Sequence, residues 1–276
     1  MTDFPTPLAL EDTHLDIIGK ALKGVGCSRE ELAQRTGLPL AELSRIEAGE
    51  ILPEALAKVA AALGLGAAAL LDSARGSWRP APVAVPGLRM VTTDFGGMLV
   101  NSFLVWDAGS REAVVFDTGA DVSELLGFAA AGGLRIVLIL ITHTHGDHLF
   151  DLDRLVEKTG APAYVGEGEP TVEGLRPFAP GKVFRVGALS IATRLTRGHA
   201  AGGITYVVTG LSCPVAVVGD ALFAGSMGGG QVSWADALRT AREEILSLPG
   251  ETVLACGHGP LTTVAEEREH NPFFAA

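Results

Sequence analysis

The chain has 276 residues and a formal net charge of −11 at pH 7, with 47% hydrophobic and 19% charged residues. This composition predicts one large domain or two unequal ones with a substantial core, and the acidic charge disfavours general nucleic-acid binding. The sequence has no apolar run of membrane-spanning length, no signal pattern and only three scattered cysteines. We therefore expect a cytoplasmic protein without a membrane partner.

The first part of the chain, residues 10–72, predicts a series of short helices. Leu15, Ile18 and Leu22 repeat at helical spacing, and Ser28 has the character of a helix N-cap. After the first helix, the expected helices cover residues 28–35, 39–48, 53–63 and 67–71.

Two stretches of this region, Ser28–Leu38 and Leu43–Gly49, resemble the Cro/repressor-type helix-turn-helix domain. The resemblance implies a small all-α domain, which we place at residues 1–74. Residues 75–87 follow with three prolines and predict a semi-rigid linker. The remaining residues, 88–276, are expected to form a second and larger domain.

The expected recognition helix is poorly suited to reading DNA. It begins with Pro39–Glu42, which offers no side chain that pairs with a base edge through two hydrogen bonds. Arg29 and Arg45 remain as phosphate contacts, so DNA is an alternative partner that charge disfavours. The competing interpretation is a docking module or a homo-oligomer formed through this domain, with Leu40 and Ile51 as apolar contacts.

Short apolar runs in the second part of the chain predict a mixed α/β fold with many strands. We expect strands at residues 89–93, 99–106, 113–117, 135–141, 162–165, 183–186, 189–195, 204–209, 214–218 and 252–255. We expect helices at residues 121–131, 149–159, 234–247 and 263–269.

Five of the seven histidines lie in three short motifs near the ends of these strands. The densest motif is Thr142–His148, with the sequence THTHGDH. Residues i and i+2 of an extended chain share a face, so His143 and His145 are expected to point to one side. Beyond the turn that follows, Asp147 and His148 are expected to face a second point a few ångströms away.

Three further donors, each beside a glycine, follow along the chain at His199, Asp220 and His258. Imidazole and carboxylate are ligands that zinc, iron and manganese accept. Seven donors are too many for one tetrahedral ion and suit two ions that share a bridging carboxylate. We therefore expect two divalent ions, zinc first with iron or manganese as alternatives. The predicted metal ligands are His143, His145, Asp147, His148, His199, Asp220 and His258.

Residues 88–276 resemble the metallo-β-lactamase fold superfamily, and the THTHGDH motif is the most specific part of the resemblance. It implies an αββα sandwich, in which two mixed sheets pack face to face with helices outside. Asp117 matches an acidic residue of the family that is a structural partner near the site. The resemblance implies these ligand sets: His143, His145 and His199 for the first metal; Asp147, His148 and His258 for the second; and Asp220 between them.

Within the superfamily, the chain resembles the glyoxalase II-like hydrolases. True glyoxalase II enzymes carry a C-terminal helical domain that helps to hold glutathione, and the residues after His258 are too few for such a domain. We therefore expect a short form, with glutathione thioesters as one candidate substrate. The resemblance lies in Asn101–Val105, Leu222–Ser226, Cys256–Pro260 and Glu269–Phe273.

The expected activity is hydrolysis of a small-molecule thioester or ester by a metal-bound hydroxide. Asp147 is the expected catalytic residue, because it would both ligate a metal and orient the hydroxide. Residues 227–230 and Trp234 are expected to line the substrate mouth. Arg194 and Arg197 are expected either to bind a substrate carboxylate or to be solvated.

Two other functions fit the same residues. A mononuclear iron oxygenase of the persulfide dioxygenase type would use His143, His199 and Asp220 as a facial triad. A metabolite-sensing regulator would combine the metal domain with DNA binding by the N-terminal helices.

Overall fold

The larger part of the protein is a sandwich of two six-stranded sheets in the computed structural model, which describes residues 8–275. Both sheets mix parallel and antiparallel neighbours. The first sheet has the order β1 (Leu88–Phe95), β2 (Met98–Trp106), β3 (Glu112–Phe116), β4 (Arg135–Ile141), β5 (Ala163–Gly166) and β6 (Leu175–Phe178). The second sheet has the order β12 (Thr262–Thr263), β11 (Val253–Cys256), β10 (Val215–Gly219), β9 (Ile204–Thr209), β8 (Leu189–Leu195) and β7 (Val183–Val186).

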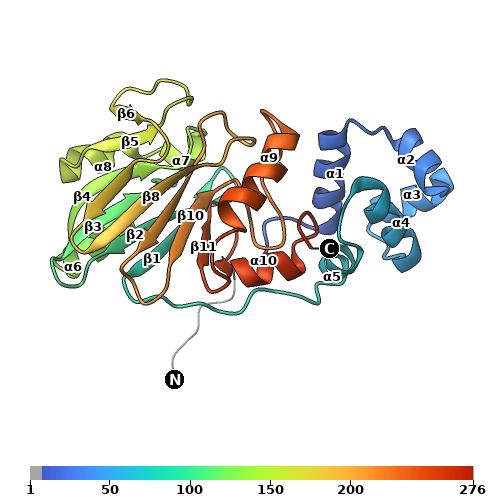
Figure 1. Ribbon diagram of the computed structural model, residues 1–276, viewed down its shortest axis with the longest axis horizontal. Coiled ribbons are helices and arrows are strands. Elements are labelled where there is room, and N and C mark those ends of the chain that lie inside the picture. Colours follow the sequence, from blue (N-terminus) through green and yellow to red (C-terminus); the bar gives the residue numbers. More distant parts are fainter. Residues whose placement is uncertain (1–7, 276) are drawn as a thin grey trace.

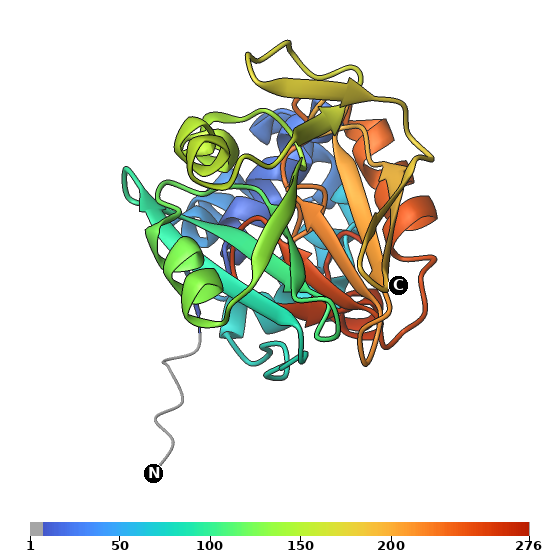
Figure 2. The ribbon, with the colours of Figure 1, turned by 90° about the vertical axis from the view of Figure 1, so that its left-hand side faces the viewer.

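Helices on the outer faces complete the αββα sandwich that the sequence predicts. Between the strands of the first sheet the chain forms α6 (Ser123–Ala131), α7 (Gly146–Leu149) and α8 (Leu152–Thr159). The second half contributes α9 (Trp234–Thr240), a π-helical turn η1 (Ala241–Ile245) and α10 (Val264–His270). Figure 2 shows the green α6 and α8 outside one sheet and the orange α9 outside the other.

The central strands are buried on both faces, which gives the site a rigid support. Successive side chains of a strand point to opposite faces of its sheet. In β3, Val114 and Phe116 enter the core between the sheets, while Val115 packs in the cluster under the outer helices. In β10, Val217 faces the same inner core and Ala216 faces the outer cluster.

The N-terminal part consists of short helices, and side-chain caps fix the starts of the first two. Thr13 with Asp16, and Ser28 with Glu31, each form a complete capping box. Among the described residues, no helix is long and apolar enough to cross a membrane. The helices are α1 (His14–Val25), α2 (Arg29–Thr36), α3 (Leu40–Glu47), α4 (Pro53–Leu63) and α5 (Ala67–Arg75).

This helical part packs directly against the sandwich. Ile17 of α1 and Leu56 of α4 belong to one hydrophobic cluster with Met227, Ala237 and Phe273 from the other half of the chain. Figure 1 shows α1 and α5 beside α9 and α10, in agreement with the contacts between these helices. The two parts therefore share a hydrophobic core.

Candidate metal centre

Parallel pairing of β3 with β4 brings two of the polar segments together. Phe116 is opposite Leu140 in this pair, so both strands end at nearly the same level. The chain then continues into Asp117 from one strand and into residues 142–148 from the other. Since the carboxyl ends of parallel strands lie at one edge of a sheet, these segments lie side by side.

The second sheet repeats this arrangement with β10 and β11. Gly219 is opposite Cys256 in this parallel pair, which places Asp220 beside the loop that carries His258. His199 comes from the connection between β8 and β9. All the predicted ligands therefore come from segments that follow strands of the two sheets.

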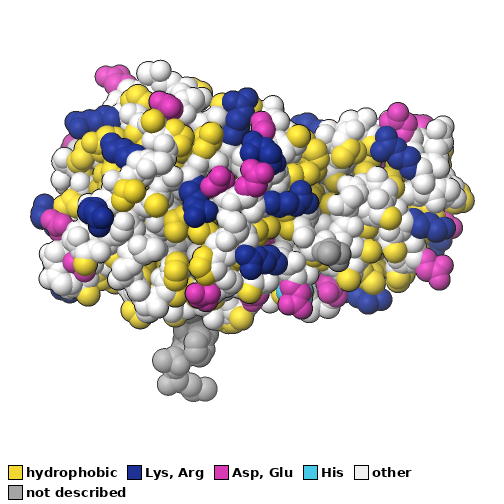
Figure 3. Space-filling model, in the orientation of Figure 1, with side chains coloured by type: hydrophobic (Ala, Val, Ile, Leu, Met, Phe, Trp, Pro, Cys, Tyr) yellow, Lys and Arg dark blue, Asp and Glu magenta, His cyan; other side chains and the backbone are white. Residues whose placement is uncertain are grey.

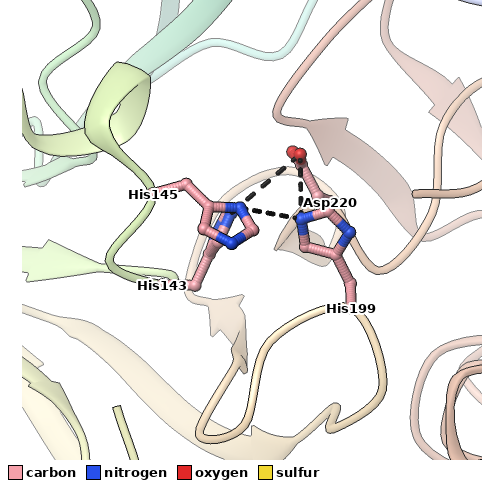
Figure 4. Close-up of side chains that lie close together, drawn as sticks. All are labelled: His143, His145, His199 and Asp220. Carbon is pink, nitrogen blue, oxygen red and sulfur yellow. Dashed lines mark hydrogen bonds and ion pairs between the residues drawn. The ribbon is translucent and has the colours of Figure 1, made fainter. Parts of the chain in front are cut away.

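Four side chains form a first set of donors, which Figure 4 shows converging on one point. His145 Nδ1 lies 3.0 Å from His143 Nε2 and 3.0 Å from His199 Nε2. Asp220 Oδ2 lies 3.4 Å from His199 Nε2 and 3.9 Å from His143 Nε2. Ligands at bonding distance from a tetrahedral zinc ion lie roughly 3.3 Å apart, so this spacing fits one such ion.

A second set lies next to the first and consists of Asp147, His148 and His258. Asp147 Oδ2 lies 3.3 Å from His258 Nε2 and 3.5 Å from His148 Nε2. Asp220 takes part here as well. Its Oδ2 lies 3.5 Å from His258 Nε2, and its Oδ1 lies 3.2 Å from His148 Nε2. One carboxylate thus lies within ligand spacing of both sets.

Two buried polar atoms in this centre fit metal ligation. His148 Nε2 and Asp220 Oδ1 are both buried and, although they lie 3.2 Å apart, neither makes a well-aligned hydrogen bond within residues 8–275. A buried polar atom without a partner is costly, so native structures rarely leave one in that state. The two atoms have the lone pairs that divalent zinc, iron or manganese accepts, and the donor sets therefore suit such ions.

Backbone carbonyls fix the orientation of two of the imidazoles. His199 Nδ1 donates to the carbonyl oxygen of Gly229 at 3.0 Å, and His258 Nδ1 donates to that of Leu99 at 2.6 Å. A proton held on Nδ1 leaves the lone pair on Nε2, which is the nitrogen that faces the centre. Such outer partners orient metal-ligating histidines in general.

Asp117 performs the same role for the first motif. Its Oδ2 accepts from His148 Nδ1 at 2.9 Å and from the Thr142 hydroxyl at 2.8 Å, and its Oδ1 accepts from the Thr142 amide. Thr142 Oγ1 in turn lies 3.0 Å from His143 Nδ1. Asp117 adopts the left-handed region at φ 54°, a strained conformation that this buried network holds in place. It is a structural partner, as the family resemblance implies.

The histidines of the two donor sets differ in the direction of their pKa shifts. Burial lowers the pKa of His143 well below its usual value, and burial also lowers the pKa of His199 against the opposing charge of Asp220. Both histidines are therefore neutral near pH 7, as metal ligands must be.

In the second set, nearby carboxylates raise the pKa of His258 more than burial lowers it. Burial opposes a charge on His258, but its hydrogen bonds with Asp147 and Asp220 raise its pKa to about 10. Burial likewise opposes ionisation of Asp147, yet the hydrogen bond with His258 and the charge of His148 lower the Asp147 pKa. This end of the centre stabilises positive charge, which is a further property that suits a cation.

Glu169 is a supporting residue that the sequence does not reveal. Its Oε2 accepts from the Thr144 amide at 2.8 Å and from the Thr144 hydroxyl at 2.7 Å, and its Oε1 accepts from the Gly202 amide at 2.7 Å. One carboxylate thus joins the loop of the first motif to the loop that carries His199. No local pattern marks Glu169, because its partners lie 25 and 33 residues away.

The expected role of two arginines as binders of a substrate carboxylate is not supported by their contacts. Arg194 Nη1 donates to the carbonyl oxygen of Glu244 at 2.9 Å, and Arg197 Nε lies 3.4 Å from Asp236. Both guanidinium groups are held against η1 and α9 instead. Their position just before His199 in the sequence was misleading, because they pair with those helices.

The expected substrate mouth at residues 227–230 and Trp234 is also wrong in part. Met227 is fully buried, and Trp234 packs in the same hydrophobic cluster as the N-terminal helices. A Cβ atom on Gly24 of α1 would lie 2.1 Å from the Trp234 ring, so the two elements are in close contact. The helical part therefore covers this loop.

The arginines of the recognition helix region are engaged within their own domain. Arg29 bonds to Glu47, with Nε and Oε1 2.9 Å apart, and Arg45 pairs with Glu50. On the face shown in Figure 3, basic side chains of the helical part at the right stand beside acidic ones. That charge disfavours DNA as a partner stays a prediction.

Family models match both parts of the chain. Residues 95–258 match the metallo-beta-lactamase superfamily, and residues 18–70 match a helix-turn-helix family.

Relatives and solved structures agree with these matches. The chain is 29% identical to the probable metallo-hydrolase YqgX of Bacillus subtilis (strain 168), over 62% of this chain and 90% of the relative. It is 31% identical to a hydroxyacylglutathione hydrolase-like protein of Homo sapiens, over 56% of this chain and 54% of the relative. The crystal structure of TTHA1623 in a di-iron-bound form matches with a TM-score of 0.54 at 26% identity, over 66% of this chain and 99% of that one. The chain therefore belongs to the metallo-beta-lactamase superfamily and carries an N-terminal helix-turn-helix domain.

Proposed function

We propose that the protein is a two-metal hydrolase that converts a thioester or ester and water into a carboxylic acid and a thiol or alcohol. The observation that carries the proposal is the position of Asp220 between two complete donor sets. In this proposal His143, His145 and His199 hold one ion, and the set of Asp147, His148 and His258 holds the other. The human relative, named as hydroxyacylglutathione hydrolase-like, supports the thioester class.

Two bound divalent ions would lower the pKa of a bridging water and polarise the acyl carbonyl of the substrate. Asp147 stays ionised near neutral pH because its pKa is lowered, so its carboxylate can orient the attacking water and accept a proton from it. The carbonyl of Leu99 and the carboxylate of Asp117 keep His258 and His148 in fixed orientations. Little reorganisation is then needed during the reaction.

Zinc is the proposed metal, with iron or manganese as alternatives. The donors are imidazole nitrogens and carboxylate oxygens, which all three metals accept. The related di-iron-bound structure supports the view that this fold also accommodates iron. A second complete donor set favours two ions over the single ion of an iron oxygenase, and it therefore favours hydrolysis over oxygen chemistry.

Replacement of Asp147 tests the proposal. In zinc-loaded protein we expect Asp147→Ala to lower kcat/KM for S-acyl thioesters by about 10²–10⁴-fold, because the group that orients the water is removed. Asp153→Ala on the exposed side of α8 is the matched control and should keep full activity. Full activity of Asp147→Ala would refute the role of this residue. Oxygen uptake on a persulfide by protein with one iron per chain would replace the hydrolase with the oxygenase.

A further inference from the structure

The loop of residues 226–229 lies directly behind the first donor set. The Gly229 carbonyl accepts from His199 Nδ1 at 3.0 Å, and the Gly228 amide donates to the Asp220 carbonyl oxygen at 3.0 Å. A Cβ atom on Gly228 would lie 2.7 Å from His199 Nδ1, so loop and ligand are in close contact. The position of this loop therefore sets the orientation of two donors.

The other side of the same loop is held by the helix-turn-helix domain. Lys20 Nζ of α1 donates to the Met227 carbonyl oxygen at 2.9 Å, and the Ser226 hydroxyl donates to the Asp12 carboxylate. Asp12 and Lys20 also form an ion pair with each other. Lys20 Nζ further lies 5.1 Å from the ring centroid of Phe223, three residues before the loop.

These contacts are partly shielded from water. The side chains of Asp12 and Lys20 are 9% and 24% exposed, and Met227 is completely buried. Hydrogen bonds to charged groups are stronger when the charges are partly desolvated, and salt screens such a pair less than a surface pair. The link is thus built from partly buried groups rather than from fully exposed surface side chains.

We propose that Lys20 and Asp12 are positioning residues of the metal centre, through which the helix-turn-helix domain holds the loop that orients His199 and Asp220. In this role the domain is a structural part of the hydrolase, and the first donor set keeps its geometry only while the domain is docked. The inference rests on the proposed metal ligands but not on the identity of the substrate.

Hydrogen bonds with Glu267 and Asn271 hold the beginning of the loop independently of the helix-turn-helix domain. Asn271 donates to the Ser226 carbonyl oxygen at 2.8 Å, and the Glu267 carboxylate accepts from the Gly225 amide at 3.0 Å. These residues belong to α10 and to the position that follows it, so they hold the loop from the sandwich side. Loss of the Lys20 contact therefore frees the part after Ser226, which is the part that contacts the ligands.

Metal affinity in the full-length chain tests this inference. Chelator-stripped protein is titrated with Zn²⁺ against a competing chelator, with no substrate present. In a His258→Ala background the first set is the complete one, and there we expect Lys20→Met to weaken zinc binding about tenfold, as the loss of an outer partner does. In a His145→Ala background, which leaves the second set, we expect a clearly smaller loss, because that set shares Asp220 with the first but does not use His199.

Lys23→Met is the matched control, because Lys23 lies on the same helix, is exposed and makes no bond to the loop within the described residues. Lys20→Arg keeps the charge and a donor and should restore most of the affinity. Equal affinity of Lys20→Met and Lys23→Met in the His258→Ala background would overturn the inference, and so would equal weakening in both backgrounds.

Ser226→Ala provides a second variant if Lys20→Met does not fold. It removes one hydroxyl that bonds to Asp12, and we expect a smaller loss of zinc affinity that is greatest in the first set. Unchanged affinity of this variant would contradict the inference. Protein that binds two zinc ions but hydrolyses no thioester would refute the proposed function and leave this inference intact.

Discussion

The histidines of the centre compete differently with protons for a metal ion. Burial lowers the pKa of His143 and His199, whereas carboxylates raise that of His258 to about 10. A metal ion can bind only the deprotonated imidazole, so binding at a histidine with a raised pKa releases a proton. The two donor sets should therefore respond differently to pH, although both consist of the same residue types.

Zinc titrations at several pH values test this difference. At pH 7 an ion that enters the second set displaces a proton from His258 and another from His148, where the effect of burial is outweighed by Asp220 and Asp117, which raise the His148 pKa well above its usual value. Its affinity should therefore rise at least tenfold per pH unit between pH 7 and 9. The ion in the first set displaces no proton in this range, and its affinity should stay nearly constant. Release of one to two protons per chain on filling the second set, followed with an indicator dye, is the direct readout. Identical pH slopes for both ions would contradict these proton affinities.

For single residues, the sequence predicts which side chains are metal donors but not which residues hold the loops that carry them. HxHxDH spacing and the strand ends were sufficient to select the side chains that the structure brings together. Glu169 was missed because its partners are remote in sequence, and the role of Arg194 stayed open because its partner Glu244 is equally remote. Such contacts depend on tertiary packing, which a local pattern does not contain.

The elements around the site follow the predicted order but differ at several ends. The helix expected at 149–159 begins only at Leu152, as α8, and the separate turn α7 precedes it. Between them, the Asp151 carboxylate accepts from the Val122 amide and the Asp151 amide donates to the Thr118 hydroxyl. Strands β6 and β12 were not predicted, since one contains a proline at the sheet edge and the other has only two residues. The helix expected at 234–247 changes at Ala241 into the π-helical η1.

Two neighbouring glycines of the loop behind the first set provide a matched test at this scale. A Cβ atom at Gly228 would lie 2.2 Å from the Asp220 carbonyl oxygen, whereas one at Gly229 would meet nothing within 4 Å. Gly228→Ala should therefore displace Asp220 or His199 and weaken zinc binding in the first set by about 10–100-fold. Gly229→Ala should bind zinc like the unmodified protein. Similar zinc affinities of the two variants would argue against close packing of this loop.

The helix-turn-helix domain and the sandwich share a core at the scale of the whole molecule. Phe273, near the end of the chain, packs against Trp234, with ring centroids 5.7 Å apart. Gly66, before α5, donates to the Pro272 carbonyl oxygen at 2.7 Å. The sequence predicts both folds but not this contact, since apolar residues on the two surfaces look like ordinary core residues of each. The domain boundaries at 74 and 87 stay a prediction.

Alanine substitutions at two glycines of α1 separate the packing of α1 against α9 from the stability of the helix itself. A Cβ atom at Gly24 would overlap the Trp234 ring, whereas Gly19 has nothing within 4 Å. Gly24→Ala should lower the free energy of unfolding by about 1–3 kcal/mol, because it forces α1 away from α9. Gly19→Ala should raise it by about 0.5–1 kcal/mol, as alanine does in a helix interior. Urea unfolding measures both, and a stabilising Gly24→Ala would contradict the docking of the two parts.

The central claim is that two ions and their shared carboxylate Asp220 perform the hydrolysis. Chelator-stripped protein is supplied with increasing Zn²⁺, and the rate of S-acyl thioester hydrolysis is measured at each ratio of metal to chain. The proposal predicts that the rate rises until two equivalents are bound and then stays constant. A rate that reaches its maximum at one equivalent, or no hydrolysis at any ratio, would contradict it.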